Sequence, residues 1–314
     1  MILAFDTSNY TTSICIVDKG IVIKEWRTLV KVKSGDQGIR QSDAFYQHTQ
    51  VLQKWVESEL VNYAHALTAV CVSTKPRPVE GSYMPVFNAG MLIGQTIAFS
   101  KGIRFIETTH QEGHLYAALK TAAGLTIDRE PLLFFHLSGG TTELHLVRWS
   151  KSGVHMQPLF ETADISVGQL VDRIGVASGL DFPSGAQMDL LAKVGAIDAR
   201  LPKFKVTEKF NLSGYENFFK QLLKNYPQNP EWVYDVLFKG IFQWLSKIIE
   251  EAASITGVNR VLLAGGVAAS ENLSKQFVRW QDEKRIMCYI SNPKYASDNA
   301  YGVALIGEET IGRI

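Results

Sequence analysis

The stretch LLFFHLSGGTTELHLVRW, residues 132–149, decides the fold. Residues 132–136 form a mainly apolar run typical of a buried strand, and residues 143–149 favour a second strand. The SGGTT between them is therefore expected to form the turn of a hairpin. Adjacent glycines let the backbone approach an anion closely, and the hydroxyl groups add hydrogen-bond donors. The stretch indicates a hairpin that binds phosphate.

Residues 1–17 contain the same arrangement. An apolar run at residues 1–5 precedes the polar turn DTSNYTT at residues 6–12, and a mainly apolar run at residues 13–17 follows it. This pattern predicts a strand, a turn rich in small hydroxyl side chains, and a second strand. In actin-like and hexokinase-like ATPases such a hairpin presents hydroxyls and backbone N–H groups to phosphate. The chain thus repeats an architecture without repeating a sequence.

A third glycine turn lies near the C-terminal end. Residues 258–263 favour a strand, and the sequence AGGVAAS at residues 264–270 leads from it toward a helix. The N-terminus of a helix directs N–H groups and the positive end of its dipole toward a ligand. This turn is therefore a further candidate for anion binding.

Two histidines suggest a metal site. His110 and His114 lie four residues apart in HQEGH, and the residues after them favour a helix. On a helix they would share one face, so that their ring nitrogens could bind one transition metal. The motif differs from that of the metalloproteases, because the glutamate does not directly follow the first histidine. Two ordinary surface histidines remain the alternative at this point.

The overall charge excludes one class of function. A formal net charge of +1 argues against extensive wrapping of nucleic acid, although a local basic patch is compatible with it. Lys203, Lys205 and Lys209 lie beside phenylalanines and could contact RNA phosphates. A solvated surface is the more common outcome for such a run.

The composition indicates a cytoplasmic globular protein. A chain of 314 residues with 46% hydrophobic content is long enough for two domains. Cys15, Cys71 and Cys288 are far apart and odd in number, which favours a reducing compartment. The N-terminus does not resemble a signal peptide, and no stretch approaches the roughly 20 apolar residues of a membrane span. We therefore expect no membrane association.

Six motifs occur in order along the chain: HxxxH, SGGTT, DIxxGQxxDR, FPSG, AGGVAAS and SDNA. In this combination the chain resembles the TsaD/Gcp glycoprotease-like family over nearly its whole length. The resemblance implies an α/β fold of the actin-like ATPase (ASKHA) architecture, with nucleotide in the cleft between two ribonuclease-H-like lobes. The N-terminal lobe would comprise residues 1–108, completed by residues 299–314, and the C-terminal lobe residues 109–298.

The resemblance also implies an activity. Members of the family transfer a threonylcarbamoyl group from its AMP conjugate to an adenosine of tRNA. The implied cofactors are a divalent metal, iron or zinc, and an ATP- or AMP-type nucleotide. The implied partners are tRNA and small partner subunits, with a homodimer as another possibility. Two alternatives are a non-catalytic nucleotide-binding regulatory or scaffold paralogue and, less favoured, an O-sialoglycoprotein endopeptidase, for which the sequence lacks the glutamate base of a zincin.

The matching motifs identify candidate site residues. His110, His114 and Asp298 correspond to the family's metal ligands, and His136, just before SGG, is a candidate third histidine ligand. Asp172 and Ser138 are the candidate catalytic residues, Asp172 either activating a nucleophile or holding a ribose hydroxyl. The candidate nucleotide-binding residues are Leu137, Ser138, Gly139, Gly140, Asp172, Gly185, Asp189, Gly265, Gly266 and Ser270.

The chain departs from the family pattern at several positions. Thr11 stands near an acidic residue of the family, and Ser270 replaces the asparagine that usually ends the GGVAAN loop. Glu216 replaces the lysine of a later FSGLKT motif, and residues 74–86 lack the family's glycine-rich stretch. These departures indicate a diverged bacterial paralogue that retains the metal and phosphate sites, while its acceptor stays open.

Overall fold

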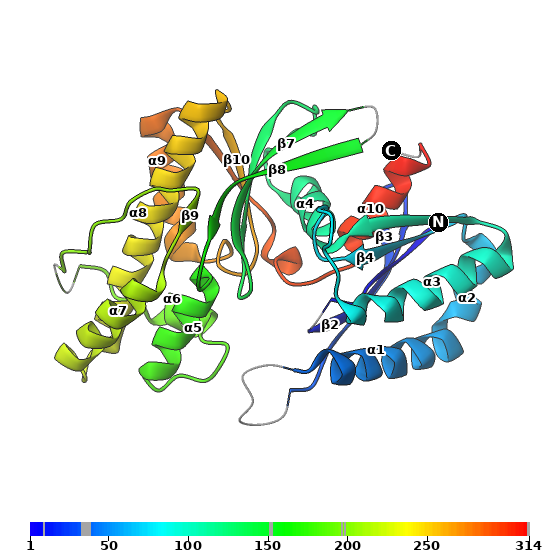
Figure 1. Ribbon diagram of the computed structural model, residues 1–314, viewed down its shortest axis with the longest axis horizontal. Coiled ribbons are helices and arrows are strands. Elements are labelled where there is room, and N and C mark those ends of the chain that lie inside the picture. The colour runs from blue at the N-terminus through cyan, green and yellow to red at the C-terminus, as the bar shows by residue number, and fades with distance from the viewer. Residues whose placement is uncertain (9, 33–38, 151–152, 196, 198, 313–314) are drawn as a thin grey trace. The chain divides into compact units, whose positions relative to one another are not determined.

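The computed structural model describes residues 1–8, 10–32, 39–150, 153–195, 197 and 199–312. The chain forms two compact units (Figure 1). Unit 1 comprises Met1–Lys120 with Asp298–Ile314, and unit 2 comprises Thr121–Ser297. The first segment of unit 1 ends at Lys120, near the end of the helix that carries the histidine pair, and the lobe boundary expected after residue 108 stays a prediction. Asn9, in the first predicted turn, lies outside the described residues.

Within its described residues, unit 1 contains a five-stranded sheet in the order β3-β2-β1-β4-β5. β1 pairs antiparallel with β2 and parallel with β4, which confirms the predicted N-terminal hairpin. The turn between β1 and β2 follows Asp6, which pairs with Ser13 in the register. The strands are β1 (Ile2–Asp6), β2 (Thr11–Asp18), β3 (Ile21–Leu29), β4 (Ala69–Lys75) and β5 (Arg104–Thr109).

Helices cover both faces of this sheet. α1 (Gln41–Trp55) and α3 (Asn88–Lys101) pack on the face that carries Phe5 and Val72. α10 (Tyr301–Thr310) contacts β1, β2 and β4. The other helical segments of unit 1 are Val56–Leu60, α2 (Val61–Tyr63), Ala64–Ala66, Pro85–Phe87 and α4 (His110–Thr121).

Unit 2 repeats this strand order, with β8-β7-β6-β10-β11 corresponding to β3-β2-β1-β4-β5 and β9 added beside β8. Its described residues form a six-stranded sheet in the order β11-β10-β6-β7-β8-β9, in which β6, β7 and β8 are antiparallel and β10 and β11 run parallel to β6. The predicted SGGTT hairpin joins β6 to β7. The strands are β6 (Leu132–Leu137), β7 (Thr142–Ser150), β8 (Gly153–Thr162), β9 (Lys209–Phe210), β10 (Arg260–Ala264) and β11 (Met287–Ile290).

The main core of unit 2 lies between this sheet and its helices. α8 (Pro230–Thr256) contributes Trp244 and Leu245, which are almost fully buried with Phe135 of β6. α8 begins with proline at its first helical position and ends before Gly257 in the left-handed conformation, both of which are favourable helix boundaries. The remaining helices are α5 (Val167–Ala177), α6 (Gly185–Leu191), α7 (Ser213–Asn225), α9 (Glu271–Lys284) and the short Pro293–Tyr295.

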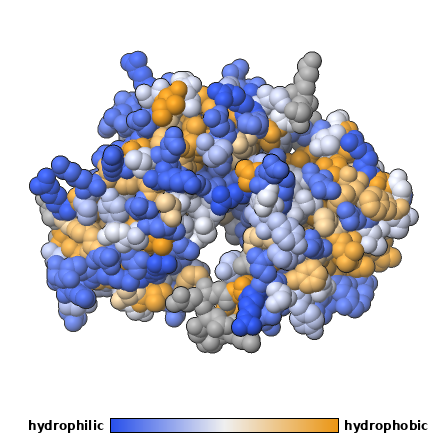
Figure 2. Space-filling view, viewed as in Figure 1, coloured by the Kyte–Doolittle hydropathy of each residue, from blue (hydrophilic) through white to orange (hydrophobic). Residues whose placement is uncertain are grey.

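The surface is mainly hydrophilic on the face shown in Figure 2, most clearly over α7. On its outer side α7 exposes Lys220, Gln221 and Lys224, while Phe219 and Leu222 are buried. This division is typical of an amphipathic surface helix. None of the helices within the described residues combines the length and the apolar content that a membrane crossing requires.

Candidate metal centre and phosphate loops

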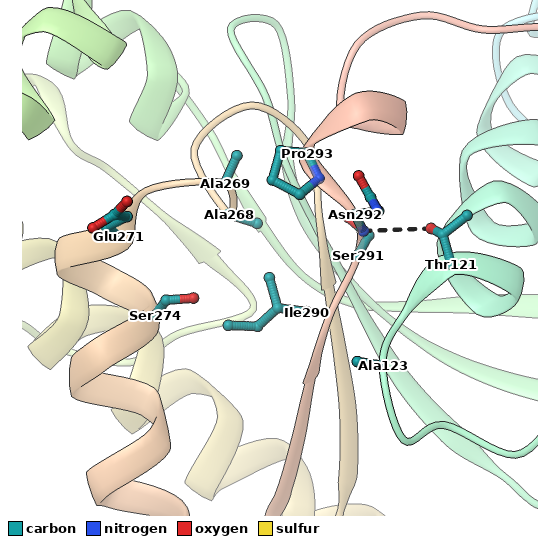
Figure 3. Close-up of a pocket in the computed structure, with 10 residues that line it drawn as sticks. All are labelled: Thr121, Ala123, Ala268, Ala269, Glu271, Ser274, Ile290, Ser291, Asn292 and Pro293. Carbon is teal, nitrogen blue, oxygen red and sulfur yellow. Dashed lines mark hydrogen bonds between the residues drawn. The ribbon is translucent and has the colours of Figure 1, made fainter.

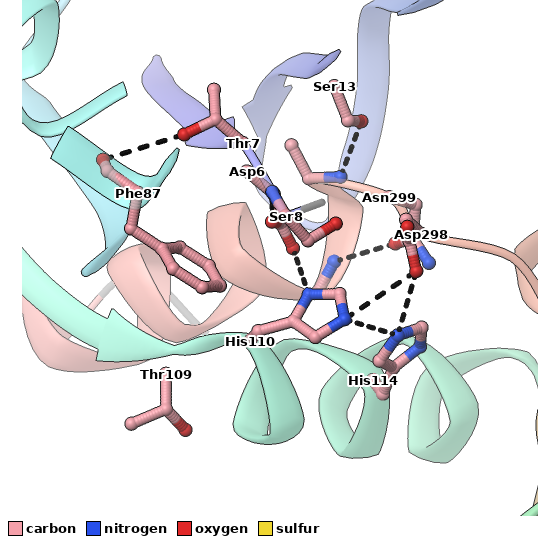
Figure 4. A network of polar contacts seen from close by, with 12 residues as sticks. Asp6, Thr7, Ser8, Ser13, Phe87, Thr109, His110, His114, Asp298 and Asn299 are labelled. Atoms are coloured by element: carbon pink, nitrogen blue, oxygen red, sulfur yellow. Dashed lines mark hydrogen bonds and ion pairs between the residues drawn. The ribbon is translucent and has the colours of Figure 1, made fainter. Parts of the chain in front are cut away.

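The histidine pair begins α4 directly after β5. His110 is the first residue of the helix and His114 follows one turn later, so the predicted helical pair is present. Their Nε2 atoms are 3.1 Å apart. Asp298 Oδ1 lies 3.5 Å from each of these two nitrogens (Figure 4). The three side chains, all in unit 1, therefore direct one donor atom each to a common point.

The spacing of these donor atoms suits a metal ion. Ligand atoms about 2.1 Å from one ion at tetrahedral angles lie about 3.4 Å apart, close to the observed separations. Two imidazoles and one carboxylate are also a donor set that zinc and iron(II) accept. Among the described residues, these three side chains form the group of histidine, cysteine and acidic residues whose ligand atoms lie close enough to one another to hold one ion. The predicted trio of His110, His114 and Asp298 is thus brought together.

Asp6 orients the first histidine, a role that the sequence did not reveal. Its Oδ2 accepts a hydrogen bond from His110 Nδ1 at 2.7 Å, and its Oδ1 accepts one from the Ser8 amide at 3.0 Å. With its proton on Nδ1, the imidazole directs the Nε2 lone pair toward the other two donors. A carboxylate behind a histidine is the usual arrangement around a protein-bound metal.

The charges of the cluster are strongly coupled. Burial alone lowers the pKa of His110, but the charge and hydrogen bond of Asp6 and the charge of Asp298 outweigh it and raise that pKa to about 9. Burial raises the pKa of Asp298, yet the hydrogen bond from His114 and the charges of both imidazoles hold it well below its usual range. In the absence of an ion, a proton on His110 therefore neutralises part of the negative charge of Asp6 and Asp298.

Removal of the Asp6 charge is expected to change how stability depends on pH. Because the pKa of His110 is raised to about 9 from 6.5, this group stabilises the metal-free fold fully below pH 6.5, and the stabilisation is lost as the pH rises through 9. The contribution amounts to roughly 3 kcal/mol. In Asp6→Asn the free energy of unfolding in chelator should decline much less over this range, as measured by urea denaturation. Parallel profiles for the two proteins would contradict the assignment.

A close contact between two helices fixes Asp298. Gly302 of α10 lies against Gly113 of α4, so closely that a Cβ on Gly302 would be 1.8 Å from the Gly113 carbonyl oxygen. The Ala300 amide also donates to Ser13 Oγ at 2.8 Å, which ties the start of α10 to β2. These two contacts hold the residues just after Asp298 beside the helix that carries the histidines.

The predicted SGGTT turn is ordered by its own hydroxyl group. Ser138 Oγ accepts hydrogen bonds from the amides of Gly140 and Thr141, at 3.3 and 3.0 Å. The carbonyl of Gly139 accepts from Ser166 Oγ at 2.8 Å, at the N-terminus of α5. Gly139 and Gly140 remain exposed. The turn is thus a stiff, solvent-facing loop with its glycines on the outside.

The second glycine turn of unit 2 lies against the first. Gly265 has a φ of +102°, and a Cβ there would be 2.2 Å from the Leu137 carbonyl oxygen. That oxygen also accepts a hydrogen bond from the Val267 amide at 3.0 Å. Only glycine combines this φ with this approach. The predicted nucleotide-binding residues at 137–140 and 265–266 are therefore neighbours.

Two other predicted residues form a second group. Asp172 of α5 accepts a hydrogen bond at 2.8 Å from the Ser184 amide, next to Gly185. Burial raises the pKa of Asp172, and the amides of Ser184 and Gly185 counteract this only in part. The carboxylate thus anchors the start of α6. Its catalytic or ribose-binding role stays a prediction.

Asp189 and Ser270 meet at the N-terminus of α9. The carboxylate of Asp189 accepts hydrogen bonds from Ser270 Oγ, from the Glu271 amide at 2.8 Å and from Asn272 Nδ2 at 2.9 Å. Ser270 Oγ also accepts from the Leu273 amide at 3.2 Å, as an N-cap does. Both side chains therefore stabilise the helix start in this structure, and a contact with nucleotide stays a prediction.

His136 belongs to unit 2, whereas the three converging donors belong to unit 1. It is buried on β6, opposite Glu143 of β7 in the sheet register. Its assignment as a metal ligand stays a prediction.

Unit 2 also contains a cavity at the carboxyl ends of β10 and β11 (Figure 3). Its volume is about 340 Å³, and small or uncharged side chains such as Ala268, Ser274 and Asn292 line most of it, with Glu271 as its acid. The predicted nucleotide-binding residues, all of which the structure describes, are absent from its lining. Ala269 and Glu271 of its lining nevertheless flank the predicted residue Ser270, so the cavity adjoins the AGGVAAS turn.

Solved structures share the fold over nearly the whole chain. A ROK family glucokinase from Streptomyces griseus aligns with a TM-score of 0.52 at 11% identity, covering 97% of both chains. HypF from T. kodakarensis aligns with a TM-score of 0.59 at 11% identity, covering 99% of this chain and 48% of its own. The chain is therefore a protein of the actin-like ATPase fold, as the sequence predicted, and it carries a candidate centre of two histidines and an aspartate.

Within this class the chain belongs to the TsaD family. A family model described as "TsaD: tRNA N6-adenosine threonylcarbamoyltransferase" matches residues 26–305. A tRNA N6-adenosine threonylcarbamoyltransferase of Staphylococcus haemolyticus is 28% identical, covering 98% of this chain and 89% of the relative. One from Shouchella clausii is 29% identical, covering 98% and 91%. A probable bifunctional tRNA threonylcarbamoyladenosine biosynthesis protein of Thermoplasma acidophilum is 23% identical, covering 97% of this chain and 55% of that longer relative.

Proposed function

We propose that this protein is a metal-dependent transferase that moves a threonylcarbamoyl group from its AMP conjugate to N6 of an adenosine in tRNA. Membership of the TsaD family supports the reaction. The observation that carries the proposal is the convergence of His110, His114 and Asp298 on one point. This geometry supports a working centre rather than a non-catalytic paralogue.

In the proposed reaction N6 of the adenosine attacks the carbamoyl carbon. A C–N bond forms, the bond between the carbamoyl carbon and the AMP phosphate oxygen breaks, and AMP leaves with the electron pair while N6 loses a proton. A divalent ion bound by the two histidines and Asp298 would supply Lewis-acid polarisation of a substrate oxygen. Asp6 would keep His110 in the tautomer that binds such an ion.

The glycine turns of unit 2 are proposed to hold the phosphate of the AMP conjugate. Gly139, Gly140 and Gly266 are exposed, and the absence of side chains permits a close approach of an anion to the backbone. The hydroxyl of Ser138 accepts two hydrogen bonds within its loop, which leaves its own proton available to a phosphate oxygen. Ser138 is thus proposed to bind the leaving group.

A direct assay tests the proposal. Purified protein with added zinc or iron(II) is incubated with the threonylcarbamoyl-AMP conjugate and an unmodified tRNA transcript, and the digested nucleosides are analysed by mass spectrometry. Threonylcarbamoyladenosine should accumulate with metal and should not accumulate with chelator. Absence of the product with metal-loaded, folded protein would contradict the proposed function.

A further inference from the structure

The coil that leads into β9 concentrates positive charge. Residues 199–209, ARLPKFKVTEK, contain four cations and a single acid, although the whole protein has a net charge of only +1. Arg200, Lys203 and Lys205 are exposed. In Figure 1 this segment is the yellow-green coil on the side of α8, and Figure 2 shows hydrophilic side chains projecting at that edge. The charge is therefore a local feature of unit 2.

Aromatic side chains anchor the backbone of this coil. The ring of Phe204 lies 5.6 Å from that of Phe210 and 6.0 Å from that of Trp244, measured between centroids. Tyr215 Oη donates a hydrogen bond to the Lys203 carbonyl at 3.1 Å. Phe204 packs on the core, whereas its neighbours Lys203 and Lys205 are exposed to solvent.

Three of the four cations of this coil differ in their pairing from several other lysines of unit 2, whereas the fourth, Lys209, lies 3.1 Å from the carboxylate of Glu161. Lys193, Lys220 and Lys275 lie 2.9, 2.5 and 3.1 Å from the carboxylates of Glu231, Glu216 and Glu271. By contrast, no carboxylate of the residues that the structure describes lies within ion-pair distance of the trio Arg200, Lys203 and Lys205. We call this trio the basic stripe. Among the described residues, it presents three cations without an ion-pair partner on an ordered backbone.

We propose that the basic stripe binds the phosphate backbone of tRNA, an inference that rests on the proposed function. Lys203 and Lys205 are two residues apart, which is at most about 7 Å of chain, so their long side chains can contact successive phosphates of one strand. The exposed side chains of the stripe are cations rather than aromatic rings, so its contacts position the RNA and do not read its bases. The buried anchors have already ordered the coil, which lowers the entropic cost of binding.

The surface around Glu216 does not share this property. Glu216 accepts from Arg173 at 2.8 Å and from Lys220 at 2.5 Å, so the two cations share one acid and the group keeps one net positive charge. A lysine at this position, as in the family motif, would add to that charge, whereas Glu216 lowers it. The basic stripe therefore carries more net positive charge than the group around Glu216.

Two triple variants test the proposal. Arg200→Gln, Lys203→Gln and Lys205→Gln together remove the stripe, whereas Lys193→Gln, Lys220→Gln and Lys275→Gln remove the same charge at paired positions. Binding of an unmodified tRNA transcript is measured by fluorescence anisotropy from about 0.05 to about 0.3 M salt. Loss of the stripe should reduce the salt slope by about 2 and weaken binding roughly 50-fold near 0.15 M salt. The paired-site variant should bind as the wild type does.

Several outcomes would overturn the proposal. The first is an equal salt slope of tRNA binding for both triple variants, and the second is failure of the wild type to bind tRNA. The third is competition for the stripe by polyglutamate or by anionic phospholipid vesicles that is as strong as competition by unlabelled tRNA, which would assign the stripe to another partner. Transferase assays separate this inference from the proposed function. The stripe variant should show a raised KM for tRNA with an unchanged kcat. A wild type that binds tRNA through the stripe but forms no product would contradict the function alone.

Discussion

Replacement of His110 and His114 together by alanine is expected to abolish stoichiometric binding of zinc or iron(II) and to leave the fold intact. The two imidazoles provide two of the three converging donors, with Nε2 atoms 3.1 Å apart. Their loss should exceed the roughly 10- to 100-fold weakening that follows removal of an outer partner such as Asp6. Metal content is measured by plasma mass spectrometry after dialysis, and the fold by circular dichroism.

A matched control is available in the same chain. His65 and His155 are exposed and lie outside the donor cluster, so His65→Ala with His155→Ala removes the same chemistry elsewhere. This control should retain one metal per chain and full transferase activity. If both double variants bound the same amount of metal, the candidate centre would be wrong.

Gly302→Ala is expected to destabilise the protein by several kcal/mol and to weaken metal binding. Its Cβ would lie 1.8 Å from the Gly113 carbonyl oxygen and 2.7 Å from the Ala117 amide nitrogen. Both neighbours are backbone atoms of α4, so the clash is relieved only by separation of the helices, at a cost above the roughly 1–3 kcal/mol of ordinary overpacking. That movement would carry Asp298 away from the histidines.

Gly214→Ala is the matched control for this substitution. Gly214 and Gly302 are each the second residue of a helix, but a Cβ on Gly214 has no neighbour within 4 Å among the described residues. Alanine should raise stability there by about 0.5–1 kcal/mol, because it favours the helix. Urea denaturation and zinc titration of both variants provide the comparison. A Gly302→Ala protein as stable as wild type would show that the contact has no importance.

The elements that the sequence predicted well have strong local signals. The hairpin expected at residues 132–149 is present as Leu132–Leu137 and Thr142–Ser150, since a buried apolar run and a double glycine leave few other structures. The helix-forming residues after His114 likewise predicted that His110 and His114 share a helix. Local patterns did not predict β8, which is mostly half-exposed or exposed, includes Pro158 and is held by pairing with β7.

Contacts between distant residues account for what the sequence did not reveal. Asp6 and His110 are 104 positions apart, so no spacing rule connects them. Asp189 and Ser270 are 81 positions apart and meet only because α6 lies beside the start of α9. For Asp298 the family motif, rather than any local pattern, placed the carboxylate with the histidines. The geometry of a site assembled from remote segments depends on the packed fold.

The start of α10 has no side-chain cap from its N-cap residue. The helix begins at Tyr301, and Ala300 is its N-cap residue. Instead Asn299 Oδ1 accepts a weak hydrogen bond from the Gly302 amide at 3.4 Å. Asp298 is thus left available for the histidines.

The origin of the three donors has a thermodynamic consequence. The histidines of α4 come before unit 2 in the chain, and Asp298 comes directly after unit 2. An ion bound by both segments would therefore cross-link the two ends of unit 2, which is inserted between the two parts of unit 1. Such a cross-link restricts the unfolded chain, and the conformational entropy that it removes grows with the length of the enclosed loop. Occupancy would thereby couple the cohesion of the N- and C-terminal parts of unit 1 to the supply of free metal.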